Sequence, residues 1–161
     1  KAMRRVGAPV SQIDLVPTLL DLMGEEVPDN LPGESLRPLC EANGDARPRK
    51  DVVVEWNGGN NGFGDTVGEV VAPPWMHEMA SVDEIAEAVR DPVRTILSPD
   101  GWKLNCSQLG EHELYDLTAD PGETRNLAFE PAQNDRCRRM RERLLAWQRE
   151  TNDTIVLPEI A

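Results

Sequence analysis

The stretch that decides the fold reads Val93-Arg94-Thr95-Ile96-Leu97-Ser98-Pro99-Asp100-Gly101-Trp102-Lys103-Leu104-Asn105-Cys106, two apolar-rich runs separated by a turn sequence. β-Branched and aromatic residues favour strands. Proline at the second position of a turn, with glycine at its end, favours a type I turn or a close variant. The stretch therefore predicts a β-hairpin with strands at 93–97 and 102–106.

Segments on both sides extend this hairpin. A β-branched run predicts a strand at 51–56, and a further strand is expected at 112–117, after a glycine-containing turn. A helix is expected to begin near Pro131, and its apolar stripe consists of Cys137, Met140, Leu144 and Trp147. We predict an α+β fold in which this carboxy-terminal helix packs on one face of a four-stranded antiparallel sheet.

The arginines of the last helix fall largely outside its apolar stripe, and they are Arg136, Arg138, Arg139, Arg143 and Arg149. A solvated helix face is the favoured interpretation, because exposed charged faces are the norm. A binding patch is the alternative.

Two further helices are predicted from capping signals. Ser11 to Asp14 resembles a capping box, apolar residues then recur at helical spacing to Met23, and Gly24 suits the end of the helix. Pro17 is tolerated only in a first turn, so the helix start shifts toward Asp14. A short helical turn is expected at 35–40, and a capping box at 81–84 begins a second helix that ends at Asp91-Pro92.

Composition narrows the function classes. The chain has 161 residues and a net charge of −12, which argues against nucleic-acid and anionic-membrane partners, because phosphate binding needs a basic surface. No apolar run approaches the roughly 20 residues that span a bilayer. The three cysteines form no CxxC pair, so the sequence supports neither a zinc knuckle nor a redox motif, and buried or half-buried thiols are expected. Because the chain starts at Lys1, we expect a fragment of a longer protein.

Three segments, in this order, resemble the sulfatase family. Residues 10–24 are similar to the helix that closes the large catalytic domain of these enzymes. Residues 31–39 resemble the family's connection to its small subdomain, and the third segment is the hairpin and turn at 94–127. The resemblance implies that residues 1–50 are the tail end of a missing α/β catalytic domain. Residues 51–161 would then form the carboxy-terminal subdomain, with a glycine-rich insertion at 57–80.

The resemblance implies a sulfuric ester hydrolase of the alkaline-phosphatase-like superfamily, with a formylglycine nucleophile beside a calcium ion. The formylglycine cannot be placed in this chain, because Cys40, Cys106 and Cys137 each lack the proline two residues on that the nucleophile motif requires. The family's metal ligands cannot be placed either, because the sequence has no Asp-Asp pair and no Asp-His-Gly. We therefore carry over no catalytic residue and no metal ligand. The expected function is that of a fragment, inactive by itself, that frames the substrate cleft. A periplasmic, secreted or lysosome-like compartment is compatible with the resemblance.

The resemblance to sulfatases implies substrate contacts from loops at one end of the sheet. The candidates are Glu55, Trp56 and Asn57 at the end of the first strand, with Trp75 and His77 beyond the glycine-rich stretch. A tryptophan offers a flat apolar face for a sugar or aryl ring, and a protonated histidine can donate to an anion. The alternative interpretation places Trp56 in the sheet core and makes His77 a solvated loop residue.

Five further residues are expected to be structural. Arg94 is predicted to pair with Asp116 or Asp120 across the sheet and turn. Tyr115 is expected to bury its ring with the hydroxyl at an edge, and Asn126 to cap or close the turn before Leu127.

Two other functions remain open at this point. One is a non-catalytic interaction module, which a reading frame without about 300 further upstream residues would favour. The other is a fragment of a phosphodiester or phosphonate hydrolase, which assays on sulfate and phosphonate esters would distinguish. The partners expected are the missing amino-terminal catalytic domain, a sulfate ester substrate and, through the exposed face of the 11–23 helix, a second copy of the chain. The other expected result of that exposure is a mobile helix.

Overall fold

The computed structural model describes residues 9–41, 51–58 and 73–160. The chain divides into two compact units, one made of 1–52 with 97–101 and the other of 53–96 with 102–161. No helix in the described residues is both long and apolar enough to cross a membrane.

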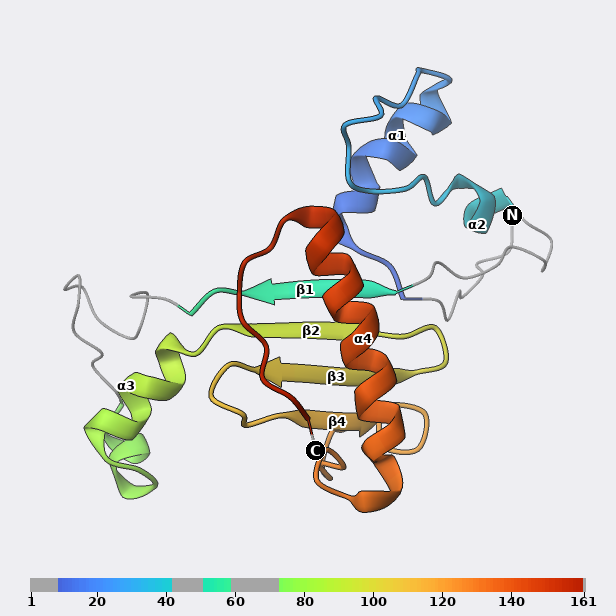
Figure 1. Cartoon of the computed structure of the whole chain (residues 1–161). Helices are drawn as coiled ribbons and strands as arrows, with labels where there is room; N and C mark the ends of the chain where they lie inside the picture. The colour runs from blue at the N-terminus through green and yellow to red at the C-terminus, as the bar shows by residue number, and fades with distance from the viewer. Residues whose placement is uncertain (1–8, 42–50, 59–72, 161) are drawn as a thin grey trace. The chain divides into compact units, whose positions relative to one another are not determined.

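The centre of the fold is a four-stranded antiparallel sheet in the order β1-β2-β3-β4 (Figure 1). Its strands are β1 (Val52–Trp56), β2 (Val93–Leu97), β3 (Trp102–Ser107) and β4 (Glu113–Asp116). In the β3–β4 pair, Leu104 lies opposite Leu114. The predicted turn between β2 and β3 forms, since the Gly101 amide donates to the Ser98 carbonyl at 3.0 Å. All four predicted strands are confirmed.

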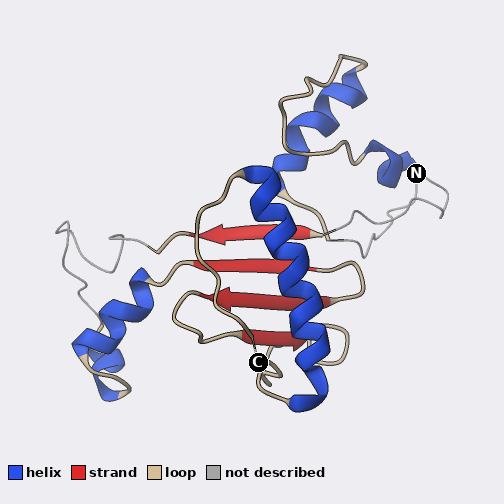
Figure 2. Cartoon of the chain, viewed as in Figure 1, coloured by secondary structure: helices blue, strands red, loops and turns tan. Residues whose placement is uncertain are grey.

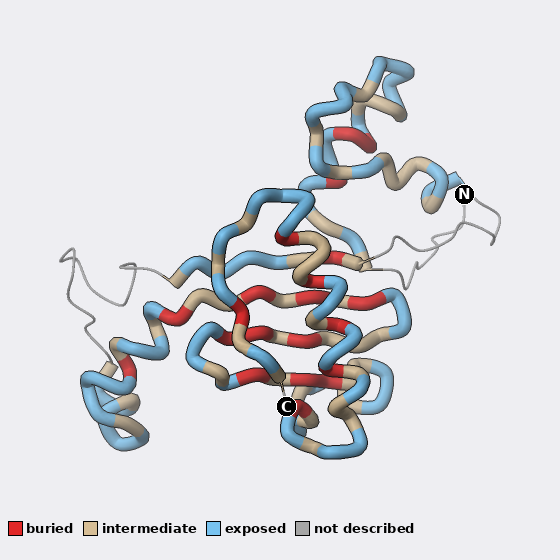
Figure 3. The backbone as a smooth tube through the Cα atoms, viewed as in Figure 1, coloured by how far each residue is buried: buried red, intermediate tan, exposed pale blue. Residues whose placement is uncertain are grey.

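The predicted carboxy-terminal helix is also confirmed: a short turn, η3 (Pro131–Gln133), leads into α4 (Asn134–Thr151). Figure 2 shows α4 lying across one face of the sheet. Cys137, Met140 and Leu144 are fully buried against that face, with Gln148 one turn further on. Buried segments follow β2, β3, β4 and the inner side of α4 (Figure 3). The core consists of Ile96, Leu104, Cys106, Leu114, Ala128, Cys137, Met140, Leu144 and Leu157.

The arginines of α4 are mostly solvated, as the favoured interpretation held. Arg138, Arg139, Arg143 and Arg149 are exposed. Arg136 is half-buried, and its guanidinium lies 4.4 Å from the ring centroid of Trp102, a cation–π distance.

The amino-terminal unit carries η1 (Gln12–Asp14), α1 (Leu15–Met23) and α2 (Arg37–Glu41). As predicted, α1 starts just after Asp14, keeps Pro17 in its first turn and ends at Gly24. The polar side of this helix is the covered side. Asp14 and Thr18 accept hydrogen bonds from the amides of Glu34 and Leu36, and Asp21 binds Ser35 and Arg37. The opposite, apolar side is exposed, and it presents Ile13, Val16, Leu19, Leu22 and Met23.

Between β1 and β2, the described residues form η2 (Pro74–Glu78) and α3 (Val82–Arg90). The predicted capping box is present, with the Glu84 carboxylate accepting from the Ser81 amide at 2.8 Å. Asp91 follows the helix and is buried. Its carboxylate accepts from the Ser107 hydroxyl at 2.5 Å and from the Gln108 amide at 3.0 Å. This contact ties the end of α3 to the β3–β4 turn.

Two of the three cysteines match the expectation of buried thiols. Cys106 and Cys137 are buried, whereas Cys40 is exposed, against the prediction, because α2 leaves it on the surface of its unit. Burial raises the pKa of Cys106 to about 12 and also raises that of Cys137, so both thiols stay protonated near neutral pH.

Candidate functional site

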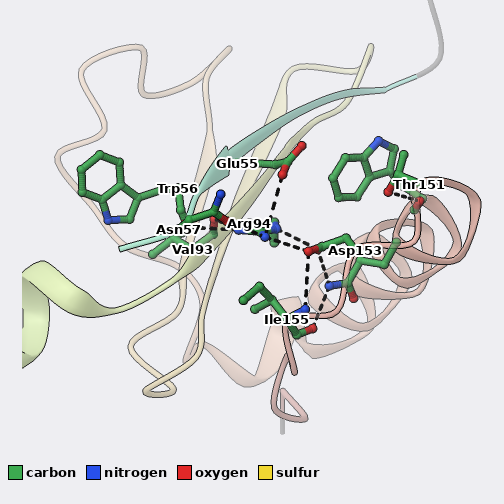
Figure 4. Close-up of polar contacts among 10 residues, drawn as sticks. Glu55, Trp56, Asn57, Val93, Arg94, Thr151, Asp153 and Ile155 are labelled. Atoms are coloured by element: carbon green, nitrogen blue, oxygen red, sulfur yellow. Dashed lines mark hydrogen bonds and ion pairs between the residues drawn. The ribbon is translucent and has the colours of Figure 1, made fainter. Parts of the chain in front are cut away.

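The candidate site lies where β1 ends, and it is organised around the buried cation Arg94 (Figure 4). Arg94 shares the alternation of β2 with Ile96, so both side chains are buried on the same side of the strand, and Arg94 is 1% exposed. A buried guanidinium is stable only if a carboxylate and hydrogen-bond acceptors surround it. Asp153, just after α4, supplies the carboxylate through two hydrogen bonds of 2.8 Å, one from Nε and one from Nη2.

The remaining Arg94 donors bind the end of β1 and the start of β2. Nη1 donates to the carbonyl oxygens of Trp56 at 3.0 Å and Val93 at 3.2 Å. Nη2 donates to the side-chain oxygen of Asn57 at 2.8 Å. A guanidinium has five N–H donors, so these acceptors and the two oxygens of Asp153 use all of them. Arg94 therefore fixes the last residues of β1.

Gln148 and Ile155 hold Asp153 in place. The Gln148 amide nitrogen donates to Asp153 at 2.7 Å and to the Ile155 carbonyl at 2.8 Å, which explains why a polar residue ends the buried stripe of α4. Hydrogen bonding from Arg94 lowers the pKa of Asp153 to about 2, and the same pair raises the pKa of Arg94. Both groups therefore remain charged throughout the physiological pH range.

Gly58 brings the backbone after β1 close to the end of α3. Its φ is +62°, and an added Cβ would lie 2.0 Å from the carbonyl oxygen of Arg90. Only glycine tolerates both this conformation and this approach. The β1 end is thus fixed on one side by Arg94 and on the other by the last turn of α3.

The predicted contact residues fall into two groups. Glu55, Trp56 and Asn57 surround Arg94, with the Glu55 carboxylate 3.9 Å from Nη2. Figure 4 shows the Trp56 indole pointing away from the guanidinium, and its side chain is 51% exposed, which excludes the alternative of a sheet-core residue in this chain. Trp75 and His77 belong to η2 and are exposed. In the described part of the chain, no hydrogen bond or ion pair joins them to the β1 group.

The predicted partner of Arg94 was wrong. Asp116 and Asp120 instead serve their own turns: Asp116 accepts from the Thr118 amide at 3.0 Å, and Asp120 accepts from the Thr124 amide at 2.8 Å. Short acidic side chains at turn starts favour local amides over a distant cation. The true partner, Asp153, follows the last helix.

The other two residues expected to be structural are Tyr115 and Asn126. Tyr115 is buried, and burial raises its pKa. Asn126 closes its turn on both sides: its oxygen accepts from the Leu114 amide at 3.0 Å and the Ala128 amide at 2.9 Å, while its nitrogen donates to the His112 carbonyl at 2.9 Å.

Neither calcium nor formylglycine fits the residues that the structure describes. Among residues 9–41, 51–58 and 73–160, no group of three His, Cys, Asp or Glu side chains is placed to hold a metal ion. The two buried cysteines lie in the hydrophobic core. We therefore derive no chemical step through either group.

Sequence and structure comparisons with known proteins both find sulfatases. No family model matches the chain. It is 32% identical over 127 residues to the sulfatase YidJ of Escherichia coli (strain K12), covering 77% of this chain and 19% of that protein. It is 29% identical over 133 residues to arylsulfatase K of Rattus norvegicus, covering 81% of this chain and 20% of that protein. The chain thus spans about a fifth of the length of the curated relatives that it matches.

Solved structures show the same fold. A 2-O GAG sulfatase matches with a TM-score of 0.62 and 28% identity, over 87% of this chain and 25% of that one. The phosphonate monoester hydrolase of Agrobacterium radiobacter matches with a TM-score of 0.58 and 26% identity, over 91% of this chain and 26% of that one. The chain is thus a homologue of sulfatases and corresponds to their carboxy-terminal portion, and its solved neighbours are sulfatases and phosphonate hydrolases of the alkaline-phosphatase-like superfamily.

Proposed function

We propose that this chain is the carboxy-terminal part of a sulfuric ester hydrolase and that the β1 end borders its substrate cleft. The observation that carries the proposal is the fixed position of Trp56 and Asn57, which are exposed yet held by the buried Arg94. Burying a cation costs desolvation free energy, and here all of its donors are used to hold a surface segment. Such rigid positioning is typical of contact residues.

The catalytic groups would come from the rest of the polypeptide. The chain spans about a fifth of its curated relatives, which supports a larger catalytic domain as its partner. We propose that residues 1–50 complete that domain and that the exposed apolar side of α1 packs against it. The calcium ion and the formylglycine residue, both implied by the family, would then lie in that larger domain, and the chain would be inactive by itself.

The substrate class follows from the relatives and from the site. One relative is named a Δ4,5-hexuronate-2-O-sulfatase, and a solved neighbour was captured with D-glucosamine-2-N,6-O-disulfate. An exposed indole at Trp56 next to an amide at Asn57 suits the alcohol part of a sulfated sugar. A phosphonate monoester hydrolase is the second candidate, because two solved neighbours carry that name.

A comparison of the full-length protein with the 161-residue chain tests this function. We expect the full-length protein to hydrolyse p-nitrophenyl sulfate faster than p-nitrophenyl phenylphosphonate, and the chain to hydrolyse neither. Faster turnover of the phosphonate would favour the second candidate. Turnover by the chain itself would contradict the proposed division of labour.

A further inference from the structure

The orientation of the Asn57 side-chain amide carries an inference that rests on the proposed function. Asparagine has one acceptor oxygen and one NH₂ donor group at the end of the same short side chain. The oxygen accepts from Arg94 Nη2 at 2.8 Å, so it faces the buried guanidinium. The NH₂ group must then point the other way, and it makes no hydrogen bond within the described part of the chain.

Arg94 cannot release Asn57 easily. Each of its five donors has one acceptor, and Asp153, held by Gln148, fixes the plane of the guanidinium. Flipping the amide would bring an NH₂ donor against the Nη2 donor, which would leave a buried N–H without an acceptor. The exposed face of Asn57 is therefore a donor, not an acceptor.

We infer that Asn57 donates a hydrogen bond to an oxygen of the alcohol part of the substrate and that Arg94 is the positioning residue that sets this polarity. An outward donor selects for ligands that present a hydroxyl, ring or carboxylate oxygen there. The alcohol part of p-nitrophenyl sulfate has no hydroxyl, ring or carboxylate oxygen, and its nitro oxygens are weak acceptors, so the contact discriminates between substrates. Arg94 itself is 1% exposed and acts only through Asn57 and the Trp56 backbone.

The test measures kcat and KM of the full-length protein on p-nitrophenyl sulfate and on three sugar probes: glucosamine 6-sulfate, galactose 6-sulfate and a 2-O-sulfated uronate disaccharide. For the sugar that is turned over, Asn57→Ala is expected to raise KM about fivefold, the worth of one neutral hydrogen bond. KM for p-nitrophenyl sulfate should stay unchanged. Asn57→Asp keeps an acceptor for Arg94 but has no donor, so it should preserve thermal stability and still raise KM for the sugar more than for the aryl sulfate.

A double-mutant cycle separates positioning from general support of the fold. Arg94→Lys offers three donors from one nitrogen and cannot satisfy the five acceptors, so it should raise KM for the sugar by about the same factor. Adding Asn57→Ala to Arg94→Lys should then have little further effect, because both changes remove the same contact. Arg125→Lys, at an exposed arginine, is the matched control and should leave both substrates unaffected.

The outcomes distinguish a failure of the proposed function from a failure of the inference about Asn57. A wild-type protein that turns over neither sulfate class would overturn the proposed function and this inference with it. An active protein whose Asn57 variants keep the wild-type KM for the sugar would overturn the inference only. Turnover of p-nitrophenyl sulfate without turnover of any sugar probe would also overturn it. If Arg94→Lys does not fold, the Asn57→Ala and Asn57→Asp pair still decides.

Discussion

At the scale of single residues, the stability of the site depends on one buried ion pair. Arg94 is 1% exposed, and the side chain of Asp153 is 10% exposed. Burying such a pair is not by itself strongly stabilising, since desolvation offsets most of the attraction. Removing one partner is different, because the other charge then remains buried without compensation.

We therefore expect Asp153→Ala to destabilise the chain by about 3–5 kcal/mol, measured by urea unfolding. Asp135→Ala breaks an exposed i,i+3 pair with Arg138 and serves as the control, with an expected loss below about 0.5 kcal/mol. Equal effects of the two substitutions would show that Arg94 is not buried in the folded chain.

His112 gives the chain a predicted pH dependence. It is 4% exposed, and its Nδ1 has no hydrogen-bond partner in the described structure. Burial lowers its pKa, the positive charge of Arg141 lowers it further, and the carboxylate of Asp91 opposes these effects. The unfolded chain accepts a proton on this histidine near pH 6.5, whereas the folded chain resists it. The contribution of His112 to the free energy of unfolding is therefore fully present above that pH and is lost as the pH falls below it.

The measurement is the urea midpoint between pH 7.5 and 5. In the wild type it should fall with pH, and in His112→Gln it should fall less. The other histidine of the chain, His77, is exposed, so His77→Gln should keep the wild-type slope. A slope that His112→Gln does not change would contradict the assignment.

At the scale of elements, the site depends on a close approach between the end of β1 and the end of α3. Gly58→Ala would place a Cβ 2.0 Å from the Arg90 carbonyl oxygen in a left-handed conformation. We expect a loss of more than about 2 kcal/mol from strain and clash together. Gly122→Ala is the control, because its nearest contact is Thr124 at an ordinary 3.4 Å. If both variants melt at the wild-type temperature, the backbone after β1 does not approach Arg90 as closely as described.

The helices and strands could be predicted because their signals are local. The Ser81–Glu84 capping box and the Ser98–Gly101 turn each lie within four residues, and the structure confirms both. The pairing of Arg94 could not be predicted in this way. Its partner Asp153 lies 59 residues away in the sequence. Acidic residues closer in the sequence, such as Asp116, are equally suitable by residue type, but the structure shows that Asp116 binds an amide of its own turn.

The candidate site was predictable only in part, for the same reason. A strand followed by glycines indicated that Glu55, Trp56 and Asn57 lie at a sheet end. Which side chains point outward depends on what fills the interior behind them, here Arg94 and Gln148. That information comes from three elements far apart in the sequence, so no local pattern contains it.

At the scale of the whole molecule, the polar side of α1 is covered by the segment that follows the helix, whereas its apolar side is exposed. Asp14 and Thr18 are buried, whereas Val16, Leu19 and Met23 are each more than half exposed. An isolated helix gains little from propensity and depends on burial of its apolar face. In the full-length protein, the proposed catalytic domain would cover this face.

In the 161-residue chain, the same face should drive self-association. We expect concentration-dependent dimers in sedimentation velocity, and we expect Leu19→Glu with Met23→Glu to yield a monomer, because two charges prevent apolar contact. Leu109→Glu, at a 49% exposed leucine of the β3–β4 turn, should leave the dimer intact. If the chain is instead a monomer at every concentration and the α1 amides resist hydrogen exchange, α1 is stable without a cover and its apolar side needs no partner.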